Sequence, residues 1–164
     1  MTSVTSNGRQ GDNKMTKQEF KDFCHTEFVK RGFQKRKSMY YLNGKDLLCG
    51  LYLQKSMAEA YYVEFDFFIG DYDDPKQYPT IYDADIAIRF TVLSKDTYKG
   101  KHFMDACIEF GLYTKEELEP YFTETFEKYI MPPILDGKHV ILKDKDYYFR
   151  ALFPDELDKV LAKL

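Results

Sequence analysis

The stretch Tyr61-Tyr-Val-Glu-Phe-Asp-Phe-Phe-Ile69 decides which fold this chain is expected to adopt. It is rich in aromatic and β-branched residues and ends at Gly70, which favours a β-strand over a helix. Successive side chains of a strand point to opposite faces. One face then holds only hydrophobic side chains and should form core: Tyr61, Val63, Phe65, Phe67 and Ile69. The other face shows two carboxylates between two rings: Tyr62, Glu64, Asp66 and Phe68.

Further strands are predicted on both sides of this stretch. Residues 33–42 and 46–54 are apolar runs separated by Asn43-Gly44, a pair that favours a tight hairpin turn with positive φ. Residues 84–92 show the clearest alternation in the chain, with only Ala87 apolar on the otherwise polar face, which predicts one half-buried antiparallel strand. Residues 102–110 also alternate and are interpreted as a strand, although their polar residues fit a helix as well.

Helices are predicted near both ends of the chain. Thr16 and Glu19 form a capping box that starts a helix over residues 17–31, and Gly32 should end it. Thr114 and Glu117 form a second capping box, whose helix should stop at the proline pair 132–133. A short strand at 140–142 and a last helix from about residue 155 follow. This order predicts an α+β fold, in which N- and C-terminal helices pack on one face of an antiparallel β-sheet of about four to six strands.

Length and composition predict one soluble domain. Residues 1–14 have no periodicity and almost nothing to bury, so we expect a disordered tail followed by a single α+β domain at 15–164. No run of about 18 apolar residues and no N-terminal apolar segment is present, which argues against a membrane span and a secretory signal. Three isolated cysteines are typical of buried thiols in a reducing compartment, so the expected location is cytoplasmic.

The charge is uneven along the chain. The formal net charge is −3, but residues 1–55 sum to +6 and residues 56–136 to −10. This distribution argues against bulk binding of a polyanion and for a protein partner that is itself charged.

Two acidic or mixed groups are candidate sites. Glu64, Asp66 and Arg89 lie on polar strand faces and could perform acid–base chemistry or hold a divalent metal; the alternative is a solvated sheet face with cross-strand ion pairs. A further group, at Asp71, Asp73 and Asp74, resembles a calcium loop only in its spacing. Such a loop needs a glutamate at its twelfth position, so we expect an acidic turn and no metal site.

Catalytic and cofactor motifs are absent from the sequence. His25, His102 and His139 share no metal-ligand spacing. No nucleophile elbow, Walker loop or dinucleotide fingerprint is present either. We therefore expect no catalytic residues and no cofactor.

A basic patch follows the first predicted helix. It consists of Lys30, Arg31, Lys35, Arg36 and Lys37 and could contact phosphates. The alternative is that the first two complement a helix C-terminus and the others protect an edge strand from aggregation. Because the rest of the chain is acidic, nucleic acid is the disfavoured partner.

One part of the chain is similar to a known kind of domain. Gly32-Phe33 after the first helix and the strand end Leu53-Gln54-Lys55-Ser56 resemble an uncharacterised family of small bacterial cytosolic domains of unknown function. The likeness covers residues 16–70. It implies an α+β fold but no reaction, and small domains of this kind often look like immunity or inhibitor proteins.

Two functions are expected from these observations. The first is a non-catalytic protein-binding module of the immunity or inhibitor type, acting on a bacterial or phage-encoded partner with basic character. The alternative is a small-ligand-binding protein or hydrolase that uses Glu64, Asp66 and Arg89. The residues expected to bind are Tyr52, Tyr62, Glu64, Asp66, Phe68, Asp71, Asp73, Asp74 and Arg89.

Overall fold

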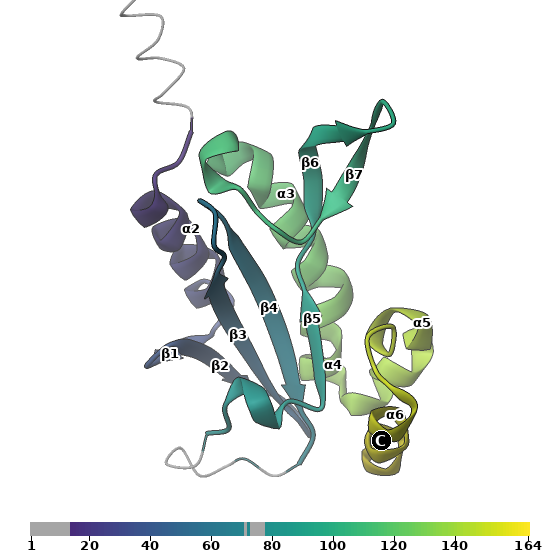
Figure 1. The fold of residues 1–164 in the computed structure, drawn as a ribbon. Helices are drawn as coiled ribbons and strands as arrows, with labels where there is room; N and C mark the ends of the chain where they lie inside the picture. Colours follow the sequence, from purple (N-terminus) through teal and green to yellow (C-terminus); the bar gives the residue numbers. More distant parts are fainter. Residues whose placement is uncertain (1–13, 71, 73–77) are drawn as a thin grey trace, which may run out of the picture.

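A five-stranded antiparallel sheet forms the centre of the molecule in the computed structural model, which describes residues 14–70, 72 and 78–164. The strands lie in sequence order: β1 (Gln34–Arg36), β2 (Met39–Asn43), β3 (Leu48–Lys55), β4 (Tyr61–Phe68) and β5 (Ile86–Arg89). A separate hairpin of β6 (Val92–Tyr98) and β7 (Lys101–Asp105) projects beyond the sheet (Figure 1). The main helices are α2 (Lys17–Val29), α3 (Lys115–Thr125), α4 (Met131–Asp136), α5 (Lys145–Tyr148) and α6 (Pro154–Lys163). The predicted α+β class is confirmed.

The hydrophobic face of β4 is buried in the core, as predicted. Tyr61, Val63, Phe65 and Phe67 are each at most 5% exposed. Phe65 lies opposite Leu51 of β3 and Ile88 of β5, so a buried residue flanks it on each side. We call this side of the sheet the helical face, because rings from α2, α3 and α5 belong to the same core cluster. The opposite side is called the open face.

Both predicted capping boxes are present. The Thr16 hydroxyl accepts from the Glu19 amide at 3.1 Å, and the Glu19 carboxylate accepts from the Thr16 amide at 3.1 Å. Thr114 and Glu117 form the same pair of bonds at the start of α3. Each box satisfies backbone N–H groups that have no partner within the helix.

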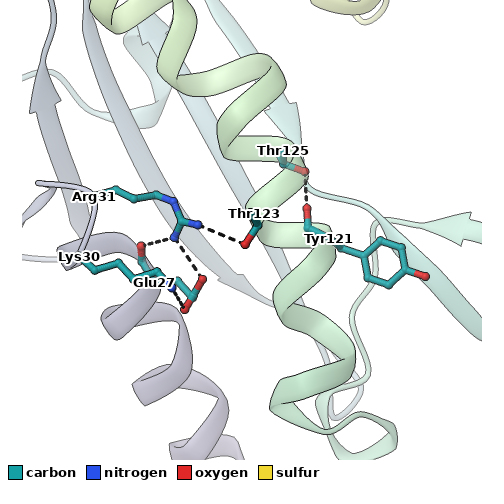
Figure 2. A network of polar contacts seen from close by, with 6 residues as sticks. All are labelled: Glu27, Lys30, Arg31, Tyr121, Thr123 and Thr125. Atoms are coloured by element: carbon teal, nitrogen blue, oxygen red, sulfur yellow. Dashed lines mark hydrogen bonds and ion pairs between the residues drawn. The ribbon is translucent and has the colours of Figure 1, made fainter.

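A buried ion cluster joins α2 to α3 (Figure 2). Glu27 is only 4% exposed and pairs with Lys30 at 2.7 Å and with Arg31 at 3.1 Å. The Arg31 guanidinium also donates to the Glu27 carbonyl and to the Thr123 hydroxyl, and it lies 4.2 Å from the ring centroid of Phe126. The buried carboxylate is therefore neutralised and hydrogen-bonded, as a buried charge must be.

The predicted strand over 84–92 is wrong in extent, since the chain leaves the sheet after Arg89. Phe90 turns into the core, where its ring contacts Phe65, Phe122 and Phe126. The Phe90 amide still donates to the Val63 carbonyl of β4 at 2.7 Å, and the chain then passes to β6 in the other sheet.

The predicted hairpin is present as β2 and β3, but the single strand predicted over 33–42 is wrong, because the chain turns at Lys37–Ser38 and forms β1 and β2. The tight turn predicted at Asn43-Gly44 is also wrong. The connection is longer, with the Gly44 amide donating to the Leu47 carbonyl at 2.8 Å, and Gly44 has no positive φ. A Cβ at Gly44 would lie 2.9 Å from the Ile134 carbonyl oxygen. Glycine is needed here because α4 passes close to the turn. This close approach is set by the tertiary structure and not by the local sequence.

Three other local predictions need correction. Residues 140–142 lie in a 3-10 helix, Lys138–Asp144, and not in a strand. Prolines 132 and 133 do not stop the helical path, because it continues through a π-helical turn at Phe126–Ile130 into α4, with proline in the first turn of α4. Of residues 102–110, only those up to Asp105 belong to a strand. The expected tail at 1–14 lies outside the described residues except for Lys14.

No helix among the described residues is long and apolar enough to cross a membrane.

Candidate functional site

The segment 78–84 covers part of the open face. Tyr41 donates a hydrogen bond to the Pro79 carbonyl at 2.5 Å, and its ring stacks on Tyr78 with centroids 4.7 Å apart. Beneath the segment lies a second apolar cluster, which includes Leu48 and Phe68. Phe68 is fully buried, so its predicted role as a binding residue is wrong: it is a packing residue.

Asp66 is buried in the same part of the open face. It is 0% exposed, and neither of its carboxylate oxygens has a hydrogen-bond partner in the described part of the chain. Its neighbours across the sheet are Gly50 of β3 and Ala87 of β5, neither of which offers a polar side chain. Burial, together with the smaller effect of the neighbouring Glu64 carboxylate, raises the pKa of Asp66 to about 10.

Asp66 is therefore a neutral carboxylic acid at physiological pH. Two neighbouring carboxylates repel each other when both are ionised, so the Glu64 carboxylate favours the neutral form of Asp66. Asp66 is not an accessible interface residue, which corrects its predicted role. A lysine in place of Asp66 would bury an ammonium group, so charge reversal at this position is expected to destabilise the fold.

The uncovered part of the open face holds four polar or aromatic side chains on adjacent strands. Glu64 lies opposite Arg89 in the register of β4 and β5. The Arg89 guanidinium lies 3.9 Å from the ring centroid of Tyr62 and donates to the Gln54 side chain at 3.3 Å. Within the described residues Glu64 and Arg89 form no ion pair, so the carboxylate of Glu64 is left for another partner.

Tyr52 completes this surface, because it lies opposite Glu64 on β3 and is partly exposed. We name the group Tyr52, Gln54, Tyr62, Glu64 and Arg89 the tyrosine–arginine patch. All five side chains lie on β3, β4 and β5, whose register fixes their positions. The patch brings together four of the predicted binding residues. Asp71, Asp73 and Asp74 lie outside the described residues, so the structure does not place them.

A comparison with protein-family models gives one match, over residues 24–136, to a domain of unknown function, DUF4304. The chain belongs to the DUF4304 family. No curated protein and no solved structure matches the chain.

The match places the site inside the DUF4304 domain. It extends from within α2 to the end of α4, and so includes the whole five-stranded sheet with the tyrosine–arginine patch. Helices α5 and α6 lie beyond it, although Tyr148 and Val160 are buried in the same core. The expected membership of a family of unknown function is confirmed.

In this DUF4304 protein the basic patch is not one surface. Lys30 and Arg31 belong to the ion cluster around Glu27. Arg36 lies on the open side, 4.5 Å from the Tyr78 ring centroid. Lys35 and Lys37, by contrast, line a cavity beside α2.

Sequence reasoning missed the residues of α2 that line this cavity. Gln18, Lys21, Asp22 and His25 follow the spacing of one helix face, and all four border the cavity. His25 is held by a 2.7 Å hydrogen bond between its Nδ1 and the Tyr40 hydroxyl. The helical spacing was visible in the sequence, but only the fold shows that this polar stripe borders a cavity. Among the described residues, no group of three or more His, Cys, Asp or Glu side chains could hold a metal ion.

Proposed function

We propose that this DUF4304 protein is a non-catalytic protein-binding module that binds its partner through the tyrosine–arginine patch. The observation that supports the proposal most directly is the stacking of the Arg89 guanidinium on the Tyr62 ring at 3.9 Å, beside the unpaired Glu64 carboxylate. The residues that contribute most to binding at protein interfaces are enriched in tyrosine and arginine. The stack also holds both side chains in place, which lowers the entropy lost on binding.

The type of partner follows from the charges of the patch. Glu64 favours a basic group on the partner. Arg89 favours a hydrogen-bond acceptor on the partner, next to that basic group. Asp66 is buried and adds no negative charge, so a basic partner is supported by Glu64 alone. We retain the immunity or inhibitor type, with a bacterial or phage-encoded partner, as part of this proposal on the basis of the sequence resemblance.

Site-specific photo-crosslinking tests the proposal. A benzophenone amino acid replaces Tyr62 in one variant and the exposed Glu119 of α3 in a matched control. The expected result is a protein cross-linked from position 62, absent from position 119 and competed by the unlabelled protein. The partner is then purified, and Arg89→Glu should weaken its binding by about tenfold or more, because a charged hot-spot contact becomes repulsive.

Two results would contradict the proposal. One is cross-linking of the same proteins from positions 62 and 119, which would indicate non-specific contact. The other is an Arg89→Glu variant that binds the purified partner as tightly as the wild type at low and high salt.

The second candidate function is a small-ligand-binding protein or hydrolase that uses Glu64, Asp66 and Arg89. The observation in its favour is the neutral Asp66 beside Glu64, since two carboxyl groups with different protonation can act as acid and base. Its test is a screen for hydrolysis with the wild type and with Asp66→Asn. This second function would be supported if the wild type hydrolyses a substrate and the folded Asp66→Asn variant does not. It would be contradicted if the wild type hydrolyses none of the substrates.

A further inference from the structure

A cavity of about 590 Å³ lies between α2 and the β1–β2 edge of the sheet. Its size is within the range of small-molecule sites. It extends around the Lys37–Ser38 turn that joins β1 to β2, so side chains from both faces of the sheet border it. Its location differs from that of the tyrosine–arginine patch, with Tyr52 at the border between them.

The cavity is strongly basic. Four lysines line it, Lys21, Lys35, Lys37 and Lys55, against a single acidic residue, Asp22, so its formal charge is +3 with histidine neutral. None of the four lysines forms an ion pair within the described part of the chain. Like charges gathered in one concave site repel one another, and a bound anion would remove this cost.

Aromatic rings hold two of these lysines at the cavity. Lys35 Nζ lies 5.9 Å from the ring centroid of Tyr40, and Lys55 Nζ lies 5.6 Å from that of Tyr61. Lys55 also donates to the backbone carbonyls of Ser56 and Ala58. These contacts fix where the ammonium groups lie but neutralise neither charge.

The backbone at Lys37 is strained. Lys37 has a φ of +58°, a region that favours glycine and asparagine. A lysine at this turn costs conformational energy, and such strain is concentrated at functional sites. In this case the strained residue adds a positive charge to the cavity.

Tyr52 provides an aromatic surface at the same cavity. Its side chain is partly exposed and lines the cavity, while it also packs against the apolar cluster of the open face. A partly exposed ring next to several lysines fits a ligand that combines a flat base with phosphate groups. The lysines would bind the phosphates as point charges, in place of the glycine-rich loop that this sequence lacks.

We propose that this cavity binds a nucleoside polyphosphate, with the phosphates on Lys21, Lys35, Lys37 and Lys55 and the base on Tyr52. The proposal shares Tyr52 with the tyrosine–arginine patch but uses neither Arg89 nor Tyr62, so Arg89→Glu should weaken binding of a protein partner and leave nucleotide binding unchanged.

Calorimetric titration with ATP and GTP at physiological salt tests the proposal. Lys37→Asn removes the charge while asparagine tolerates the positive φ, and its matched control is Lys99→Asn, since Lys99 has a φ of +51° in the β6–β7 turn. We expect saturable binding, weakened about tenfold by Lys37→Asn and unchanged by Lys99→Asn, because a charge-assisted contact is lost in only one of them. Tyr52→Leu should also weaken binding, and Tyr98→Leu is its exposed control.

Four outcomes would overturn the proposal. The first is no saturable binding of either nucleotide. The second is equal weakening by Lys37→Asn and Lys99→Asn, which would indicate bulk electrostatic attraction. The third is that pyrophosphate binds as tightly as ATP and that Tyr52→Leu does not weaken ATP binding. This result would indicate a phosphate site without a base site. The fourth is an RNA oligonucleotide that binds more tightly than the mononucleotides.

Discussion

Asp66 is the residue whose protonation should control how stability depends on pH. Its folded-state pKa of about 10 lies above the ordinary value of 3.8, so between these values the folded protein holds one proton more than the unfolded chain. The stability due to this group is therefore fully present below about pH 4 and is lost as pH rises, at about 1.4 kcal/mol per pH unit. Asparagine cannot ionise and resembles the neutral acid in shape.

We predict that Asp66→Asn becomes increasingly more stable than the wild type as pH rises. Between pH 5 and pH 8 the difference in unfolding free energy should grow by up to about 4 kcal/mol in favour of the variant. Urea unfolding at both pH values measures it, with Asp96→Asn as the exposed comparison. A difference that does not change with pH would mean that Asp66 is ionised in the folded protein.

Phe65 should be the most costly ring of β4 to truncate, since it lies at the centre of the helical face and is fully buried. Phe65→Ala should lower the free energy of unfolding by about 3–5 kcal/mol. Phe103→Ala is the matched control, because Phe103 is 41% exposed and should cost less than about 1 kcal/mol. Equal losses in the two variants would show that Phe65 is not a core residue.

The contact between α2 and α3 depends on Arg31. Arg31→Met should destabilise the protein by about 2 kcal/mol, because the buried Glu27 then keeps only Lys30 and the bond to Thr123 is lost (Figure 2). The matched control is Lys128→Met, which breaks an ion pair with Glu124 in which both side chains are more than half exposed. That change should cost less than about 0.5 kcal/mol. Equal costs would mean that the buried cluster contributes no more than a surface pair.

For the whole molecule we predict that residues 1–14 are dispensable for stability. Described contacts begin at Met15, whose side chain is buried and whose amide donates to the Tyr113 carbonyl at 3.3 Å. A chain that starts at Met15 should keep the melting temperature of the full chain. Met15→Ala in the full chain should lower stability by about 2 kcal/mol or more. Calorimetry decides both, and a drop of several degrees on truncation would refute the prediction.

The single domain predicted for 15–164 is tested by the same calorimetry. Tyr148 contacts Phe67 of β4 and donates to the Tyr129 carbonyl at 2.7 Å, while Lys163 of α6 pairs with Asp85 at 2.6 Å. These contacts connect the C-terminal helices to the sheet, so one cooperative transition is expected for the whole described chain. Two separate transitions would show independent units.

Features set by neighbours in the sequence could be predicted from the sequence. The alternation of residues 61–69 identified the buried face of β4, and the spacing of Thr16 and Glu19 identified the start of α2. Both signals are local, since a strand has a side-chain period of two residues and a capping box closes within one helical turn. The α+β class followed from the order of such elements.

The tertiary structure alone decided the character of the candidate sites. The alternation of β4 places Asp66 on the polar face of the strand, as expected for a surface residue. In the structure, segment 78–84 and the apolar cluster beneath it lie on the same part of the open face, and burial raises the pKa of Asp66. Residues 84–92 have the pattern of one strand, yet they are divided between two sheets, and Phe90 packs on Phe122 of α3 where the chain passes from one to the other. The cavity lined by four lysines forms because the fold brings α2, the Lys37 turn and Lys55 together, although they are distant from one another in the sequence. Burial and electrostatic potential depend on residues brought together through space, and the local pattern of a sequence does not contain that information.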